Sequence, residues 1–225
     1  MRVYWILVFL AACWPAAVSA QGSGHSSSSK STSHTKKPAA SESSLEPGAV
    51  LNGAYRNKSL ALTCKIPEGW VLRTEEMNAR EEDGDAAKDS PQGGQRGTEE
   101  HGRVLLAAFS RPPDARGEEI NSSILIAAEP VSGYPGLTDA GQYFGPLTEV
   151  AKAQGFEADE EPYEFAIGTK KLVRGDFHRD VGTRVMRQST LAFLARGYAV
   201  SITVIGGTEE EVEALVEGVS FSAVK

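Results

Sequence analysis

The chain is poor in cysteine and in aromatic side chains, and it has no excess of positive charge. Its 225 residues include 2 cysteines, 8% aromatic residues and a formal net charge of -7. Two cysteines cannot build a disulfide scaffold. The surplus of acidic residues argues against a nucleic-acid partner, because a phosphate-binding face needs excess lysine and arginine.

Known catalytic and nucleotide-binding motifs are also missing. The sequence has no Walker loop, no Gly-x-Ser-x-Gly elbow, no His-Glu-x-x-His and no Cys-x-x-Cys. We therefore expect no cofactor. What remains, 40% hydrophobic and 24% charged residues, is typical of a soluble globular protein.

The N-terminus has the pattern of a secretory signal peptide. Arg2 precedes a run of twelve apolar residues, 3–14, and small residues follow up to Ala20. A positive start, a short apolar centre and a small-residue exit predict cleavage after Ala20 and a secreted or periplasmic protein. The apolar run is too short to span a bilayer, which takes ~20 residues.

A competing interpretation places a lipid anchor in the same segment. Leu10-Ala11-Ala12-Cys13 resembles a bacterial lipobox, in which the cysteine is acylated and becomes the first residue. Under this alternative the protein is anchored to the cell envelope through Cys13. Contact with a membrane is expected only in that case.

Composition divides the rest of the chain into a leader and one domain. Residues 21–49 are rich in serine and threonine and predict a disordered leader. Residues 50–225 have the size of a single domain. Within it, residues 74–102 carry nine acidic residues and several glycines, which predicts a long mobile loop inserted into the domain.

Periodicity in residues 50–225 predicts an α+β fold. Helices are expected from a cap at Thr138 to Gly155, with Pro146 kinking or splitting the first one, and again from a capping box at Thr208. We expect an antiparallel sheet covered by these two main helices. Its strands are predicted at about 59–66, 104–109, 124–128, 162–167, 170–178, 183–194 and 198–205.

Cys64 lies in an alternating strand pattern. Leu60, Leu62, Cys64 and Ile66 fall on one face of the segment 59–66. This predicts a buried and chemically inert thiol rather than a nucleophile.

Asp176, His178 and Asp180 form a weak candidate metal site. Alternation on a strand would aim all three at one face, and carboxylate with imidazole suits zinc or manganese. Arg174 shares that face and would repel a cation. An exposed polar strand face is the competing interpretation.

Charge is unevenly distributed along the chain, and the segment 170–187 is basic. This could be a solvated face, or a basic strand face that docks an acidic partner or the acidic loop. The weak candidate partner-binding residues are Lys170, Lys171, Arg174, Arg179, Arg184 and Arg187.

The order of these elements resembles the PsbP-like family. The resemblance covers residues 50–222 and is carried by a Tyr-x-Asn start at Tyr55, the turn Pro67-Glu68-Gly69-Trp70, a helix after Thr138, an antiparallel meander and a final helix ending near Phe221. It implies an α/β/α sandwich in an exported bacterial member, with no shared catalytic motif. The long insertion at 74–102 departs from the family pattern.

Together these features predict an exported, non-enzymatic binding or assembly module with an unknown protein partner, and we expect a monomer. Two alternatives stay open. One is an envelope metal-dependent hydrolase built on Asp176, His178 and Asp180. The other is a small-ligand carrier that uses a cavity between sheet and helices.

Overall fold

The computed structural model describes residues 45–79, 102–112, 115 and 120–222. The predicted signal peptide, Cys13, most of the leader and residues 80–101 of the acidic insertion lie outside the described residues. The first described residue, Leu45, is already in the core, with 2% of its surface exposed. The packed domain therefore begins before residue 50, where we expected its start.

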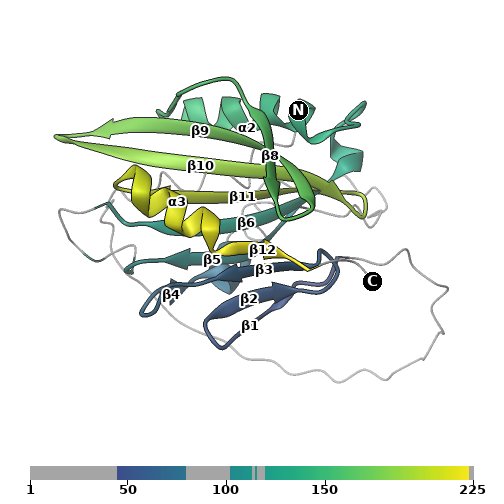
Figure 1. Ribbon diagram of the computed structural model, residues 1–225, viewed down its shortest axis with the longest axis horizontal. Helices are drawn as coiled ribbons and strands as arrows, with labels where there is room; N and C mark the ends of the chain where they lie inside the picture. The colour runs from purple at the N-terminus through teal and green to yellow at the C-terminus, as the bar shows by residue number, and fades with distance from the viewer. Residues whose placement is uncertain (1–44, 80–101, 113–114, 116–119, 223–225) are drawn as a thin grey trace, which may run out of the picture.

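A large antiparallel sheet forms the centre of the domain (Figure 1). Each predicted strand after residue 100 is found, with ends moved by up to three residues. In spatial order the sheet contains β4 (Val71–Leu72), β5 (Arg103–Phe109), β6 (Ser123–Pro130), β11 (Tyr198–Gly206), β10 (Arg184–Ala195), β9 (Lys170–Val181) and β7 (Glu157–Ala158), with β8 (Tyr163–Ile167) also paired to β9.

A second sheet of four short strands joins the two ends of the domain. Its order is β1 (Ala49–Leu51), β2 (Ala54–Asn57), β3 (Leu62–Lys65) and β12 (Val219–Phe221). The last strand pairs with β3 in a register that places Val219 opposite Cys64. The predicted extended tail at 220–222 is thus a strand of this small sheet.

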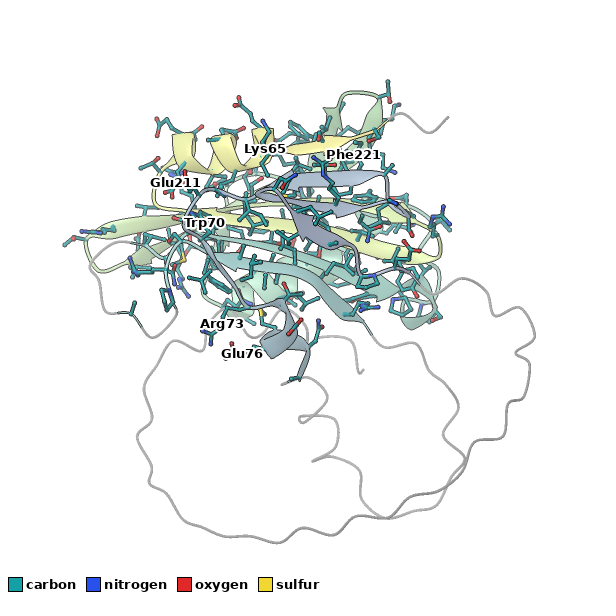
Figure 2. The ribbon with its side chains drawn as sticks, turned by 90° about the horizontal axis from the view of Figure 1, so that it is seen from below. Lys65, Trp70, Arg73, Glu76, Glu211 and Phe221 are labelled. Atoms are coloured by element: carbon teal, nitrogen blue, oxygen red, sulfur yellow. The ribbon has the colours of Figure 1, made fainter. Side chains whose placement is uncertain are left out.

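The two faces of the large sheet are covered differently. Helix α2 (Ala140–Ala153) packs on one face, and α3 (Glu209–Glu217) shares the other with the small sheet (Figures 1 and 2). The short 3-10 helix η2 (Val131–Gly133) follows β6. The α+β class is confirmed. The expectation of two helices as the covering layers is incomplete, because a small sheet makes up much of the second layer.

Burial follows from this layering. All nine residues of β11 are buried, because both faces of a central strand meet a covering layer. On the small sheet, Leu60, Leu62 and Cys64 all face the core, as their alternation predicted. Cys64 is fully buried, and burial raises the pKa of its thiol to about 12, which confirms an inert core residue.

Helix α2 begins one residue later than expected and is a single helix. Its cap is Asp139, whose carboxylate accepts a hydrogen bond from the Gln142 backbone N–H, instead of Thr138. Pro146 lies inside the helix without splitting it. Gly155 follows the end with a φ of 82°, a backbone conformation that favours glycine.

The predicted cap of α3 is confirmed. The Thr208 hydroxyl accepts a hydrogen bond from the Glu211 backbone N–H at 3.2 Å. The Glu211 carboxylate reaches back to the Gly207 N–H at 2.8 Å and also accepts from the Ser122 hydroxyl. This one side chain therefore joins the start of α3 to the start of β6.

Strand β4 pairs with β5 only at Ala108 and Phe109, and a short helical segment covers more of that outer edge. Residues 74–79 are helical, so the predicted loop does not begin at residue 74. The Asn78 amide accepts from the Val104 N–H and donates to the Val104 C=O, both at 2.9 Å. The Thr74 hydroxyl accepts from the Ala107 N–H at 2.9 Å. These side chains satisfy backbone groups that another strand would otherwise bind.

We predict that Asn78→Ala lowers the free energy of unfolding by about 1–3 kcal/mol, because it leaves two partly buried backbone groups of Val104 without partners. Urea unfolding measures the difference. Glu75→Ala is the matched control, since Glu75 is exposed on the same helical segment. Equal unfolding midpoints for the two variants would contradict the edge-covering role.

We also predict an alkaline loss of stability due to Cys64. Its ordinary pKa of 9.0 applies to the unfolded chain, and about 12 applies to the native state. Between these values the unfolded chain releases a proton that the native state keeps, so the unfolding free energy falls as pH rises, by about 1.4 kcal/mol per unit. Denaturant unfolding of wild type and Cys64→Val across this range measures it; parallel pH curves would refute it.

Candidate functional site

The hairpin formed by β9 and β10 is longer than the strands beside it. The last pair between β10 and β11 is Arg187 with Gly206, and β7 pairs with β9 only at residues 177 and 178. Residues 179–186 therefore form a two-stranded ribbon beyond both neighbours. This ribbon, which we call the arm, projects past the end of α3 in Figure 1.

A two-residue turn closes the arm. Val181 pairs with Arg184 across Gly182 and Thr183. Gly182 has a φ of 63°, as the first position of a type II′ hairpin turn requires. Val181 is 41% exposed and Arg184 is exposed, and their pairing puts both side chains on the same face of the arm. The tip thus presents a cation beside an apolar side chain.

The base of the arm is held against α2 by Arg179. Its Nη1 donates to the Gln154 carbonyl at 2.6 Å, and the guanidinium lies 5.0 Å from the centre of the Phe156 ring. A cation near the C-terminus of a helix is electrostatically favourable. A second N–H of Arg179 donates to the Met186 sulfur at 3.5 Å, across the ribbon.

On the other face of the base, His178 contacts Asp159. His178 Nδ1 lies 2.5 Å from Asp159 Oδ1. Close by, the pKa of Glu210 at the start of α3 is lowered. The causes are hydrogen bonds to its own backbone amide and to the Thr208 hydroxyl, and the positive charge of Arg187. The arm is therefore anchored on both faces at its base, while its tip is exposed.

The six basic residues of the segment 170–187 do not share one face. Their strands pair so that Arg187 lies opposite His178 and Arg184 lies opposite Val181. Side chains alternate along each strand, so three of the six lie on each face of the sheet. Lys170, Arg174 and Arg187 lie on the side of α3, and Lys171, Arg179 and Arg184 lie on the side of α2. The single basic face expected from the sequence is not formed.

Arg174 is the most enclosed of these cations, with 8% of its side chain exposed. Its Nε donates to Asp176 at 2.9 Å, and its terminal nitrogens bind the Glu213 carboxylate of α3. Burial alone would lower the pKa of Arg174, but the hydrogen bonds that it donates to the carboxylates of Glu213 and Asp176 hold it above its ordinary value. Arg174 therefore links β9 to α3 and is not available to a partner.

The three predicted metal ligands have separate surroundings. Asp176 accepts from Arg174 and from the Tyr163 hydroxyl at 2.9 Å, His178 faces Asp159, and Asp180 is exposed. Across the described ranges, no three His, Cys, Asp or Glu side chains group closely enough to hold a metal ion. A metal role for these residues stays a prediction.

A small pocket lies beneath the C-terminal half of α2. It holds about one water molecule. Gln188, Thr190 and Thr203 of the sheet contribute its polar wall, and Gln188 Oε1 is buried without a hydrogen-bond partner. This space is small for the ligand of a carrier protein.

The sequence patterns did not reveal that Val181 lies in the arm or that Glu213 pairs with Arg174. Val181 was placed beyond a strand ending at residue 178, although Gly182-Thr183 is a hairpin signal that would have extended both strands. Glu213, which pairs with Arg174, was given no role by the sequence patterns. Nothing local in the sequence marks it as the partner of a cation 39 residues away.

No family model matches this chain, and no curated protein matches it. Solved structures with a related arrangement include cyanobacterial PsbP (CyanoP) from Synechocystis sp. PCC 6803, at 12% identity and a TM-score of 0.41 over 78% of this chain and 96% of that one. A second structure is LpqN, involved in cell envelope biogenesis of Mycobacterium tuberculosis. It shows 11% identity and a TM-score of 0.34 over 72% of this chain and 83% of that one.

A protein of unknown function from Pseudomonas aeruginosa, PA94, gives 16% identity and a TM-score of 0.34 over 53% of this chain and 76% of that one. One of these structures is a PsbP, but the TM-scores and identities are low, so the PsbP-like fold and family stay a prediction. At these values the likeness says nothing about activity or partners. None of the described helices is both long and apolar enough to cross a membrane.

We predict that Arg174→Met lowers the free energy of unfolding by about 2–3 kcal/mol, because Asp176 and Glu213 lose a shared cation. This is below the ~3–5 kcal/mol typical of a broken buried ion pair, because Glu213 is partly exposed. Urea unfolding tests the value, with Lys171→Met as the control on the same strand. A loss no larger than that of the control would show that the Arg174 cluster is not stabilising.

Proposed function

We propose that this chain is an exported, non-enzymatic binding module that docks a protein partner through the arm. The observation that carries the proposal is the exposed pair Val181 and Arg184 at the tip of an anchored, projecting hairpin. No hydrogen bond or ion pair within the described residues engages the Arg184 side chain. Arginine is one of the residue types that contribute most to binding energy at protein interfaces.

The arm face that carries this pair favours a partner with an acidic rim around an apolar patch. Val181, Arg184 and Met186 lie on one face of the ribbon, and the acidic Asp180 points to the opposite face. Charge complementarity steers such a partner and fixes its orientation. Because Arg179 already secures the base, little conformational entropy is lost at the arm on binding.

Export is supported by the N-terminal sequence pattern, which lies outside the described residues. In the proposed route, cleavage leaves Gln21 as the first residue. N-terminal sequencing and intact mass of the protein from its native envelope distinguish this route from acylation at Cys13. A mature chain that still begins at Met1 would contradict export.

We predict that a photo-crosslinking amino acid at Thr183 captures one partner protein in native cells. Arg184→Glu should reduce that crosslink about tenfold, because a charge reversal at the anchor costs more than 1.4 kcal/mol of binding. Lys58→Glu is the matched control, an exposed cation on the small sheet. The proposal fails if Arg184→Glu leaves the crosslink unchanged, or if Lys58→Glu reduces it equally.

A further inference from the structure

The outer edge of the small sheet is formed by β1, which pairs only with β2 within the described residues. Leu51 pairs with Ala54 across a two-residue turn at Asn52-Gly53, whose φ values are 51° and 69°. These values define a type I′ hairpin, so Leu51 and Ala54 exchange both of their backbone hydrogen bonds. Because bonded and non-bonded pairs alternate, Val50 directs its N–H and C=O away from β2.

Among the described residues no other strand pairs with this edge, whereas other segments cover the edges of β5 and β9. Thr74 and Asn78 cover β5, and the short strands β7 and β8 cover β9. The residues of β1 are alanine, valine and leucine, without the charge, proline or bulge that blunts an edge strand. Val50 and Leu51 are 37% and 59% exposed, and they make up half of the large hydrophobic side chains exposed in the described residues.

The strand is also fixed in place at both ends. Gly48 has a φ of 75°, and a side chain there would lie 2.7 Å from the Tyr55 ring. The Tyr55 hydroxyl donates to the Pro47 carbonyl at 2.9 Å, and Asn57 donates to the Glu46 carbonyl at 2.8 Å. The three extended residues of β1 are therefore ordered, and the turns on either side of them prevent a longer strand.

We propose that the occupant of this edge is the β1 strand of a second copy of the chain. Two-fold symmetry pairs antiparallel strands about a central residue, which places Val50 opposite Val50 of the partner subunit. The outward N–H and C=O of each valine then bond reciprocally. Because each central residue meets its own copy, a charge there would repel itself, whereas two valines make a favourable cross-strand pair.

Pairing of this kind covers the exposed side chains on both faces of the sheet. Val50 lies on the inner face beside Tyr55, and Leu51 lies on the outer face beside Ala54. In the symmetric register each Leu51 packs over Ala49 of the partner subunit. The two small sheets become one sheet of eight strands, and no further copy can add at the same edge because the symmetry is closed.

The interface is small, so the association is weak and depends on concentration. This dimer differs from the monomer expected from the sequence. It is independent of the proposed docking through the arm, because no residue of the arm takes part.

The test is sedimentation velocity of the purified full-length chain over a concentration series. We expect a dimer fraction that rises with concentration in the wild type. Val50→Lys alone and Val50→Glu alone should each weaken association at least about tenfold through like-charge repulsion. An equimolar mixture of the two should form a heterodimer, because the charges then face each other. Leu72→Lys is the matched control, because Leu72 is an exposed apolar side chain on the short strand β4, and it should retain the wild-type association.

A measurement on the wild type does not depend on how well the variants fold. Hydrogen exchange of the Val50 backbone amide should slow as concentration rises, because the amide becomes bonded only in the dimer. A wild type that is monomeric up to its solubility limit overturns the proposal. Association that survives in Val50→Lys, or Val50 exchange that is independent of concentration while a dimer forms, overturns it as well.

Discussion

The constraint on which this structure depends is that both faces of the central sheet are apolar. A sheet whose middle strands are buried on both faces needs two covering layers, and the described residues contain only two long helices to supply them. One helix covers one face. The other helix is too short to cover its face alone, so residues from the two ends of the domain make a small sheet that completes the layer. The folding of the first strands is thereby coupled to that of the last.

The arm is the part of this sheet that the covering layers leave uncovered. Strands β9 and β10 have 12 residues each, whereas β11 has 9 and β7 has 2. Side chains at the base of the hairpin still meet covering elements, which explains why the Arg179 side chain has hydrogen-bond partners and the Arg184 side chain has none among the described residues. The difference between an anchored base and an exposed tip thus follows from strand length.

Patterns that depend on neighbouring residues could be predicted from the sequence. The apolar runs of β5, β6 and β11 and the cap at Thr208 are local, and these were found where the patterns placed them. The buried position of Cys64 followed from alternation alone. The strand β1 could also have been found, because Asn52-Gly53 is a strong hairpin signal that lay unused beside the leader.

Patterns that depend on distant residues could not be predicted in this way. A count of charges in residues 170–187 ignores that a pleated strand sends successive side chains to opposite faces, so six cations became two sets of three. The partner of Arg174 lies on a helix 39 residues later, and only the packing of α3 reveals it.

The covering of sheet edges also depends on distant residues, so it could not be predicted from the sequence. At β5, a helical segment presents Thr74 and Asn78 to backbone groups that would otherwise attract another strand. A sequence pattern cannot reveal this, because it depends on where a non-strand segment packs. At β1 no such cover exists in the described residues, although the same physical need applies. Among the described residues, side chains therefore cover backbone groups on the edge of β5, whereas the outward backbone groups of Val50 on β1 have no strand beside them.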